Sequence, residues 1–341
     1  MLREAIGGRA APIVNFTQTN SLPCCSAAGP AIPDGPHNRL VRFVILFGIA
    51  ALGASAQATP EQRAIGYLSR EVPRWYAQNK CYSCHNNGDA ARALYVAVRQ
   101  GRSITKGALD GTSDWLAAPE RWDHNRGNPA FSDKKLARIQ FAAALAAATR
   151  AHALKKKEPL LAAAAAVARE QGRDGSWMVD ADADVGSPAT WGTALATYMA
   201  RGVLESASAK EFARPIAKAN AWFAAYQPAG VFESAVKLMA IPEAAELVEK
   251  IVAAQASDGG WGPRAHSPSE PFDTEIALLA LNRAGAAPEA VVRGRAFLIA
   301  NQEKEGGWAE TTRPPGGHSY AQHISTSGWA TQALLVTDTK R

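Results

Sequence analysis

A short pattern of glutamine, glycine and tryptophan recurs three times in this chain and constrains its fold more than any other feature. The copies read QGRDGSW from Gln171, QASDGGW from Gln255 and QEKEGGW from Gln302, and in each the tryptophan lies six residues after the glutamine. An Asp-Gly or Gly-Gly step supplies the positive φ that a tight helix-ending turn needs. The glutamine amide can bond exposed backbone groups there while the indole covers the turn. We interpret each copy as a clasp that ends a helix.

The segments around these clasps predict helices. Residues 132–154 and 159–171 place apolar side chains on one face at a spacing of about 3.6 residues. Further helices are expected after the clasps, over residues 190–200, 273–281 and 326–335, and a degenerate fourth copy starts at Gln227. Repeats of roughly 20 to 50 residues are typical of stacked helix pairs. With no convincing alternating strand pattern, the sequence predicts an all-α protein.

The clasps resemble the QW motifs of the squalene-hopene cyclase and prenyltransferase superfamily. The copy at Gln302 also matches the upstream part of that motif through Arg293, Gly294 and Leu298. The resemblance covers residues 129–341 and implies an α/α toroid, in which helix pairs form an inner and an outer ring. Helices before Gln171 are expected to extend the same toroid towards the N-terminus.

The resemblance does not carry over to the catalytic acid of the cyclases. Squalene-hopene cyclases protonate an alkene with a DxDD-T motif, and the matching stretch here, residues 270–274, has Phe272 at the position of the protonating aspartate. A phenyl ring cannot donate a proton, so cyclase chemistry is disfavoured, and a terpenoid cyclase-like enzyme without the usual DxDD acid is kept as an alternative function. The cluster Asp180, Asp182 and Asp184 is similar to the motif in composition, but its place directly after a clasp favours a solvated loop.

Two alternative uses of the toroid follow from the same resemblance. Prenyltransferases of this fold hold zinc with Asp, Cys and His, whereas no cysteine follows Cys84 here. His318 and His323, near the last expected helix, are interpreted as capping residues, with metal ligation as the alternative. An apolar toroid can also hold a terpenoid or another lipid, which is the alternative ligand class.

The second informative motif is Cys81, Tyr82, Ser83, Cys84 and His85. It resembles the CxxCH sequence of c-type cytochromes, in which both thiols add to the vinyl groups of haem and the histidine ligates the iron. The resemblance implies one covalent haem c in residues 59–128. A disulfide across the two-residue gap and a chance match are the alternatives.

The second axial ligand of such a haem is not evident from the sequence. No methionine occurs between His85 and Met178, so the usual downstream methionine is missing. His124 is the nearest alternative ligand, followed by His152. An open position would permit binding of a small ligand or peroxide chemistry. We expect a redox or electron-transfer function with an unknown redox partner.

Residues 1–58 contain a secretory signal peptide on our interpretation. Arg39 and Arg42 precede a short apolar run, residues 43–52, and small residues follow at the spacing of a cleavage site. The run is about half of the roughly 20 residues that a membrane-spanning helix needs, so an uncleaved anchor is less favoured.

Cleavage near Ala56 or Ala58 would place the mature protein in the periplasm, where covalent haem attachment normally takes place. The residues before the signal are interpreted as a misassigned leader, with translation starting near Val41. The formal net charge of +6 comes from scattered lysines and arginines. Without a cluster of basic and aromatic residues, nothing points to a nucleic-acid partner.

Overall fold

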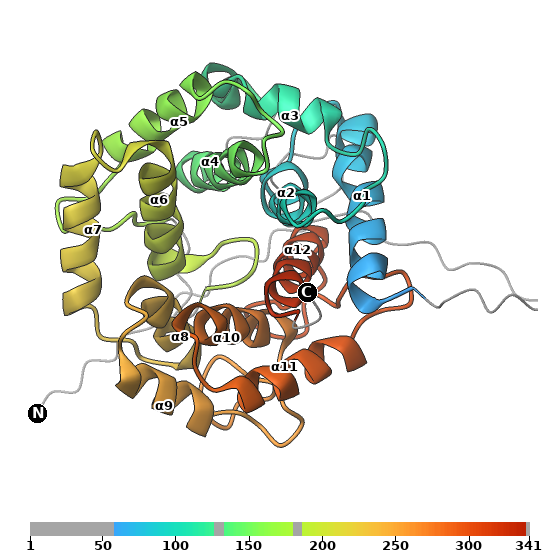
Figure 1. Cartoon of the computed structure of the whole chain (residues 1–341), viewed down its shortest axis with the longest axis vertical. Helices are drawn as coiled ribbons and strands as arrows, with labels where there is room; N and C mark the ends of the chain where they lie inside the picture. Colours follow the sequence, from blue (N-terminus) through green and yellow to red (C-terminus); the bar gives the residue numbers. More distant parts are fainter. Residues whose placement is uncertain (1–57, 126–132, 180–185, 339–341) are drawn as a thin grey trace, which may run out of the picture.

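Helices alternate between an inner and an outer ring along the whole described chain, which makes an α/α toroid (Figure 1). The computed structural model describes residues 58–125, 133–179 and 186–338. The predicted signal peptide and the residues before it, up to residue 57, and the cluster of Asp180, Asp182 and Asp184 lie outside these ranges. Within them the chain forms no strand, and no helix is both long and apolar enough to cross a membrane.

Among the described residues, six α-helices belong to each ring, as the arrangement in Figure 1 illustrates. The inner ring consists of α2 (Ala91–Arg99), α4 (Lys134–Arg150), α6 (Gly192–Ser208), α8 (Val231–Ala240), α10 (Pro271–Ala284) and α12 (Tyr320–Val336). The outer ring consists of α1 (Pro60–Asn79), α3 (Asp110–Leu116), α5 (Glu158–Arg169), α7 (Ala213–Ala225), α9 (Ala245–Ala253) and α11 (Pro288–Ala300). A π-helix, η1 (Cys84–Ala90), leads directly into α2, and a 3-10 helix, η2 (Pro119–His124), follows α3.

The inner ring closes between the first and the last inner helix. The guanidinium of Arg92 in α2 lies 3.8 Å from the ring centroid of Trp329 in α12, and Gln100 Nε2 donates to the Leu335 carbonyl at 3.1 Å. The helices of residues 59–128 therefore lie in the same ring as those of residues 129–341. The sequence-based expectation of an all-α toroid is confirmed.

Inner helices are buried on nearly all sides, which explains their composition. Every residue of 141–148 in α4 is buried, and six of these eight are alanines. A helix that is apolar all round is a buried helix, and small side chains let its neighbours approach closely. The alanine-rich segment of residues 141–148 thus suits the inner ring, whereas the alanine-rich α5 lies in the outer ring and is buried on one face only.

The three clasps join neighbouring repeats through one repeated set of hydrogen bonds. Each glutamine amide donates to the carbonyl four residues later and to a carbonyl at the start of the next outer helix, at 2.7 to 3.0 Å. Each tryptophan indole donates to the carbonyl ten residues earlier. The partners in the next outer helix are Pro215 for Gln171, Ala290 for Gln255 and Pro60 for Gln302.

The third clasp closes the outer ring, because Pro60 begins α1 and Gln302 follows α11. The degenerate fourth copy is not a clasp in the structure. The Gln227 amide is exposed and reaches only the nearby Ala225 carbonyl, at 3.5 Å, and Phe232 lies within α8 and not in a turn.

We expect Gln302→Ala to lower the free energy of unfolding by about 1 to 3 kcal/mol, because the carbonyls of Pro60 and Gly306 both lose a donor. Urea unfolding followed by circular dichroism measures this. Gln227→Ala is the matched control and should change stability by less than about 0.5 kcal/mol. Equal effects of the two substitutions would contradict the ring-closing role.

Candidate functional site

The CxxCH motif, residues 81–85, leads into η1, which is packed between two inner helices. Gly88 faces α4, where a Cβ atom would come within 3.2 Å of Gln140 Cβ, and Gly328 of α12 faces η1, where a Cβ would come within 3.0 Å of Ala90 backbone atoms. The two glycines therefore allow both helices to press against η1. This packing places side chains of η1, α4 and α12 within hydrogen-bonding distance of one another.

His85 is buried and takes part in a polar chain. Its Nδ1 lies 3.3 Å from the Ser325 hydroxyl, which donates to Asp89 Oδ2 at 2.8 Å. Gln140 Nε2 donates to the same carboxylate oxygen at 3.0 Å. Three helices that are far apart in sequence thus contribute to one cluster.

Burial shifts both ionisable groups of this cluster towards their neutral forms. Desolvation lowers the pKa of His85 to about 4, so the imidazole is neutral at pH 7. Desolvation also raises the pKa of Asp89 to about 7, although the nearby Arg92 cation and the hydrogen bonds to the carboxylate oppose this shift. A neutral imidazole is the form that can ligate a metal.

The two cysteines of the motif are buried on either side of the turn. The Cys84 sulfur lies 3.7 Å from Nε2 and 3.9 Å from Nδ1 of His85. Cys81 packs against Trp75 and Tyr320, whose rings are stacked with centroids 5.4 Å apart. Cys81 is also disulfide-bonded.

A backbone carbonyl of α1 and side chains of α3 and α12 hold η1 in place. Asn86 Nδ2 donates to the Glu71 carbonyl at 3.0 Å and to the Tyr320 hydroxyl at 2.9 Å. Asn87 Nδ2 donates to the Thr112 hydroxyl at 2.8 Å. These residues directly follow CxxCH, so the same short segment carries both the motif and its anchors.

The other predicted ligands lie at the surface. His124 is exposed at the end of η2, but the adjacent Asn125 bonds both backbone groups of Tyr82 within the motif, at 3.1 and 2.6 Å. His152 is exposed, and 65% of the Met178 surface is accessible. His124 as the distal haem ligand therefore stays a prediction.

His318 and His323 lie on either side of one carboxylate. His318 Nδ1 is 3.0 Å from Glu310 Oε1, and His323 Nδ1 is 3.4 Å from Glu310 Oε2. No group of three or more potential metal ligands occurs among the described residues. The observed contacts are those of a loop held by charged and polar side chains.

Sequence reasoning missed a second set of polar groups inside the toroid. Arg92 lies over Trp329, and its Nη1 is 3.3 Å from the Met199 sulfur. Glu275 of α10 is fully buried, and neither of its carboxyl oxygens has a hydrogen-bond partner in the described structure. Arg92 and Glu275 are each a charged residue within a largely apolar stretch of sequence, and this is the signal that could have identified them.

Burial and the neighbouring Asp273 raise the pKa of Glu275 well above its ordinary value, and Arg92 only partly opposes this. Burial therefore favours the neutral carboxylic acid form of Glu275. One turn earlier, Phe272 is fully buried between the rings of Phe232 and Trp329. Phe272 is a packing residue here.

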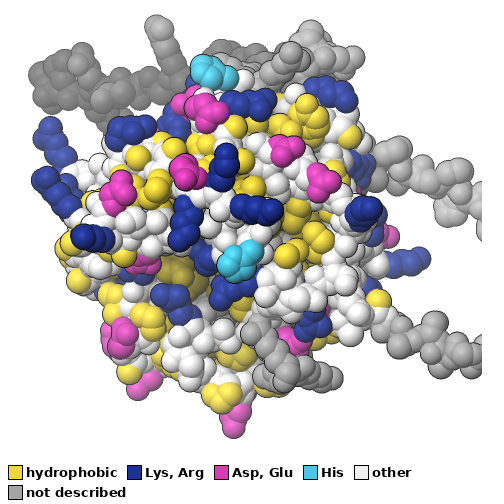
Figure 2. Space-filling model, turned by 45° about the horizontal axis from the view of Figure 1, so that its top comes forward, with side chains coloured by type: hydrophobic (Ala, Val, Ile, Leu, Met, Phe, Trp, Pro, Cys, Tyr) yellow, Lys and Arg dark blue, Asp and Glu magenta, His cyan; other side chains and the backbone are white. Residues whose placement is uncertain are grey.

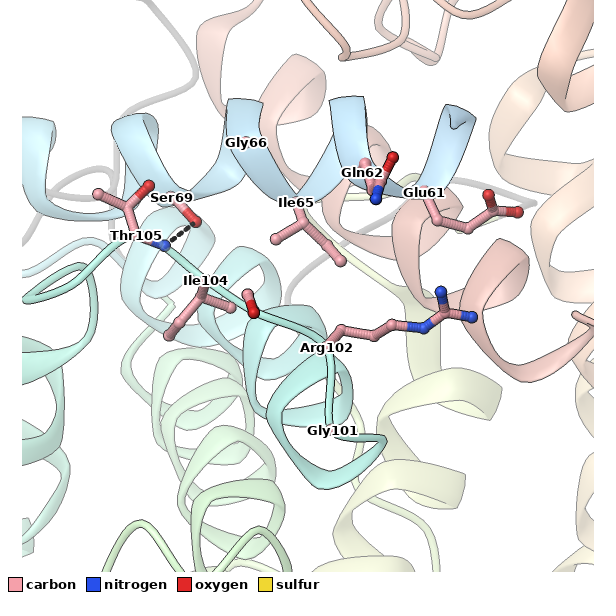
Figure 3. Close-up of a pocket in the computed structure, with 10 residues that line it drawn as sticks. Glu61, Gln62, Ile65, Gly66, Ser69, Gly101, Arg102, Ile104 and Thr105 are labelled. Carbon is pink, nitrogen blue, oxygen red and sulfur yellow. Dashed lines mark hydrogen bonds between the residues drawn. The ribbon is translucent and has the colours of Figure 1, made fainter. Parts of the chain in front are cut away.

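Two cavities lie at the end of the toroid where the inner helices finish. The first, of about 420 Å³, lies between α1 and residues 101–105, and in Figure 3 the Arg102 side chain points along it towards Glu61. The second, of about 980 Å³, lies between α1, α11 and the ends of α10 and α12. Neither includes a residue of the CxxCH motif, which is at the opposite end of α2.

The visible surface carries no dominant charge. On the face shown in Figure 2, lysine and arginine side chains are spread among acidic and apolar ones.

Known structures with a similar arrangement of helices include terpene cyclases. The type II terpene cyclase MstE from Scytonema is 17% identical over 73% of this chain and 86% of its own, with a TM-score of 0.45. For ent-copalyl diphosphate synthase from Streptomyces platensis the identity is 17%, the coverage 72% and 50%, and the TM-score 0.47. A protein from Actinoplanes is 16% identical, with 81% and 99% covered and a TM-score of 0.48. No protein-family model and no curated protein matches the sequence.

We expect Asp89→Asn to change how stability depends on pH. Between pH 4 and 7 the wild-type carboxyl is protonated when folded and ionised when unfolded, so unfolding releases a proton and stability falls as pH rises. The amide does not titrate. The stability of Asp89→Asn relative to wild type should therefore increase across this window, by at most about 4 kcal/mol.

Urea unfolding at several pH values measures this difference, with the exposed Asp114→Asn as the control. A difference between Asp89→Asn and wild type that stays constant with pH would show that Asp89 titrates normally in the folded protein.

Proposed function

We propose that residues 81–85 bind one haem c covalently and that the chain is an exported redox protein whose toroid partly encloses the haem. The observation that carries this proposal is the state of His85. Its imidazole is buried and neutral, and Nδ1 is engaged by Ser325, which leaves Nε2 for iron. Metal-bound histidines typically use one ring nitrogen for the metal and the other for such a hydrogen bond.

The chemistry of the surrounding groups also suits a haem. Two cysteines and a histidine are the donor set of haem c attachment, and the Cys84 sulfur lies beside Nε2. The buried indole N–H of Trp75, next to Cys81, has no acceptor among the described residues and could donate to a carboxylate of the haem. The disulfide at Cys81 has to be reduced before that thiol can add to a vinyl group.

A bound haem would supply reversible one-electron chemistry at its iron. The residues of the chain would hold and shield it. Cys81 and Cys84 anchor its edge, His85 supplies the proximal nitrogen, and η1 is fixed by Asn86 and Asn87 so that this nitrogen keeps its place.

The test is to express the full chain in a host with a haem c maturation system and to measure the mass of the denatured, exported protein. We expect the mass of one haem to be retained and a c-type optical spectrum. Cys84→Ala should lose a covalent link and alter the spectrum, whereas Ser103→Ala at the opposite end of α2 should leave both unchanged. A haem-free wild-type protein with Cys81 in a disulfide would refute the proposal.

A second function, chemistry on or binding of a terpenoid inside the toroid, is favoured by one observation. Glu275 is fully buried one turn from Phe272, and burial raises its pKa well above the ordinary value, which favours the protonated carboxylic acid. A protonated carboxylic acid has a proton to donate to an alkene, whereas the phenyl ring of Phe272 has none. Its carboxyl oxygens have almost no accessible surface, so a ligand has to displace side chains before it reaches them.

We expect Glu275→Gln to abolish any cyclisation of an acyclic isoprenoid such as geranylgeraniol, because an amide is too weak an acid. Gas chromatography of extracted products measures this. Glu249→Gln, exposed on α9, is the matched control and should retain activity. The absence of any cyclic product from the wild type, or equal products from wild type and Glu275→Gln, would exclude acid catalysis by Glu275.

A further inference from the structure

We infer that Asp89 and Ser325 are positioning residues for His85, which hold its imidazole through Nδ1 with Nε2 turned to the haem iron and thereby lower the reduction potential of the haem. This inference rests on the proposed haem attachment. It assigns a role to two residues that are outside the CxxCH motif and that come from different helices.

The hydrogen-bond directions select one tautomer of His85. Ser325 has a single hydroxyl hydrogen, which it donates to Asp89 Oδ2 at 2.8 Å. The hydroxyl can then only accept from His85 Nδ1, at 3.3 Å, so Nδ1 carries the hydrogen. Nε2 is left unprotonated, which is the form that binds iron.

The positions of these side chains are determined by packed helices. Ser325 is fully buried in α12, Asp89 is buried in η1, and Gln140 of α4 also bonds the Asp89 carboxylate. Gly328 allows α12 to approach the backbone of η1 one turn after Ser325. The pair is therefore held by backbone packing and not by a mobile loop.

The electrical effect follows from the direction of the hydrogen bonds. Asp89 Oδ2 accepts the Ser325 hydrogen, which makes the Ser325 oxygen a stronger acceptor for the Nδ1–H of His85 and makes Nε2 a stronger donor to iron. A stronger donor stabilises the ferric form more than the ferrous form. The low dielectric of the buried cluster strengthens this effect, so loss of either residue should favour reduction.

The experiment is a redox titration of the haem-loaded full chain and of Ser325→Ala, Asp89→Ala, which removes the acceptor of the Ser325 hydrogen, and the double variant. At a fixed solution potential, each single variant should show about a tenfold higher ratio of ferrous to ferric protein, which corresponds to about 59 mV. The double variant should show no further change, because both substitutions break the same link. Unchanged potentials, or additive shifts, would overturn the inference.

Thr331→Val is the matched control. Thr331 is also buried in α12, but its hydroxyl donates at 2.7 Å to the Ser327 carbonyl of its own helix. We expect its potential to equal that of the wild type. A shift as large as that of Ser325→Ala would show that any lost hydroxyl in α12 disturbs the haem, and the inference would fail.

The protein without haem separates this inference from the proposed function. If the wild type carries no haem, the proposed function fails, and nitrogen-15 NMR of His85 then tests the pair directly. The wild type should carry its hydrogen on Nδ1, and Ser325→Ala should show a mixture of tautomers. A wild-type His85 with its hydrogen on Nε2 would refute the positioning role.

Discussion

The close approach of α4 and α12 to the π-helix η1 is the constraint on which the candidate site depends. Glycine at positions 88 and 328 removes the two Cβ atoms that would keep these helices apart. As a result, Asp89, Gln140 and Ser325 meet at one carboxylate although they are more than 40 residues apart along the chain. The first inner helix is joined to its neighbours through polar side chains as well as through apolar packing.

The clasps provide the corresponding constraint for the outer ring. Each glutamine ends its own helix and also bonds the start of the next outer helix, so one side chain determines both a helix end and the spacing of two repeats. The indole beneath it is fully buried in all three copies. The hydrogen bonds of the clasps therefore connect successive outer helices. The CxxCH segment is part of the same closed ring, because η1 leads directly into the inner helix α2.

The sequence predicted the architecture well because its signals are local. A Gln, a Gly turn and a Trp at fixed spacing specify a helix end, and apolar side chains at a spacing of about 3.6 residues specify the helices themselves. The observed helices α4, α5, α6, α10 and α12 match the expected ranges in type and approximate position. The fourth copy at Gln227 failed because it lacks the tryptophan, whose indole bond to the preceding helix is part of every true clasp.

The partners of His85 could not be predicted in the same way. Ser325 and Asp89 are 236 residues apart, and their contact depends on ring closure, for which local patterns carry no signal. Glu275 and Arg92 were visible only as charges within apolar runs. The CxxCH motif itself was evident, but only the structure shows that His85 is buried and held through Nδ1.

Closure of the outer ring by Gln302 and Pro60 also has a topological consequence. Residues 58 and 338 border the same cavity, and Arg102 beside them forms an ion pair with Asp338 at 2.5 Å. A closed ring has no terminal repeat that needs a polar cap, in contrast to an open solenoid. A short linker could therefore join the first and last helices. The chain could then be opened between any two outer helices instead, and every repeat would keep both of its neighbours.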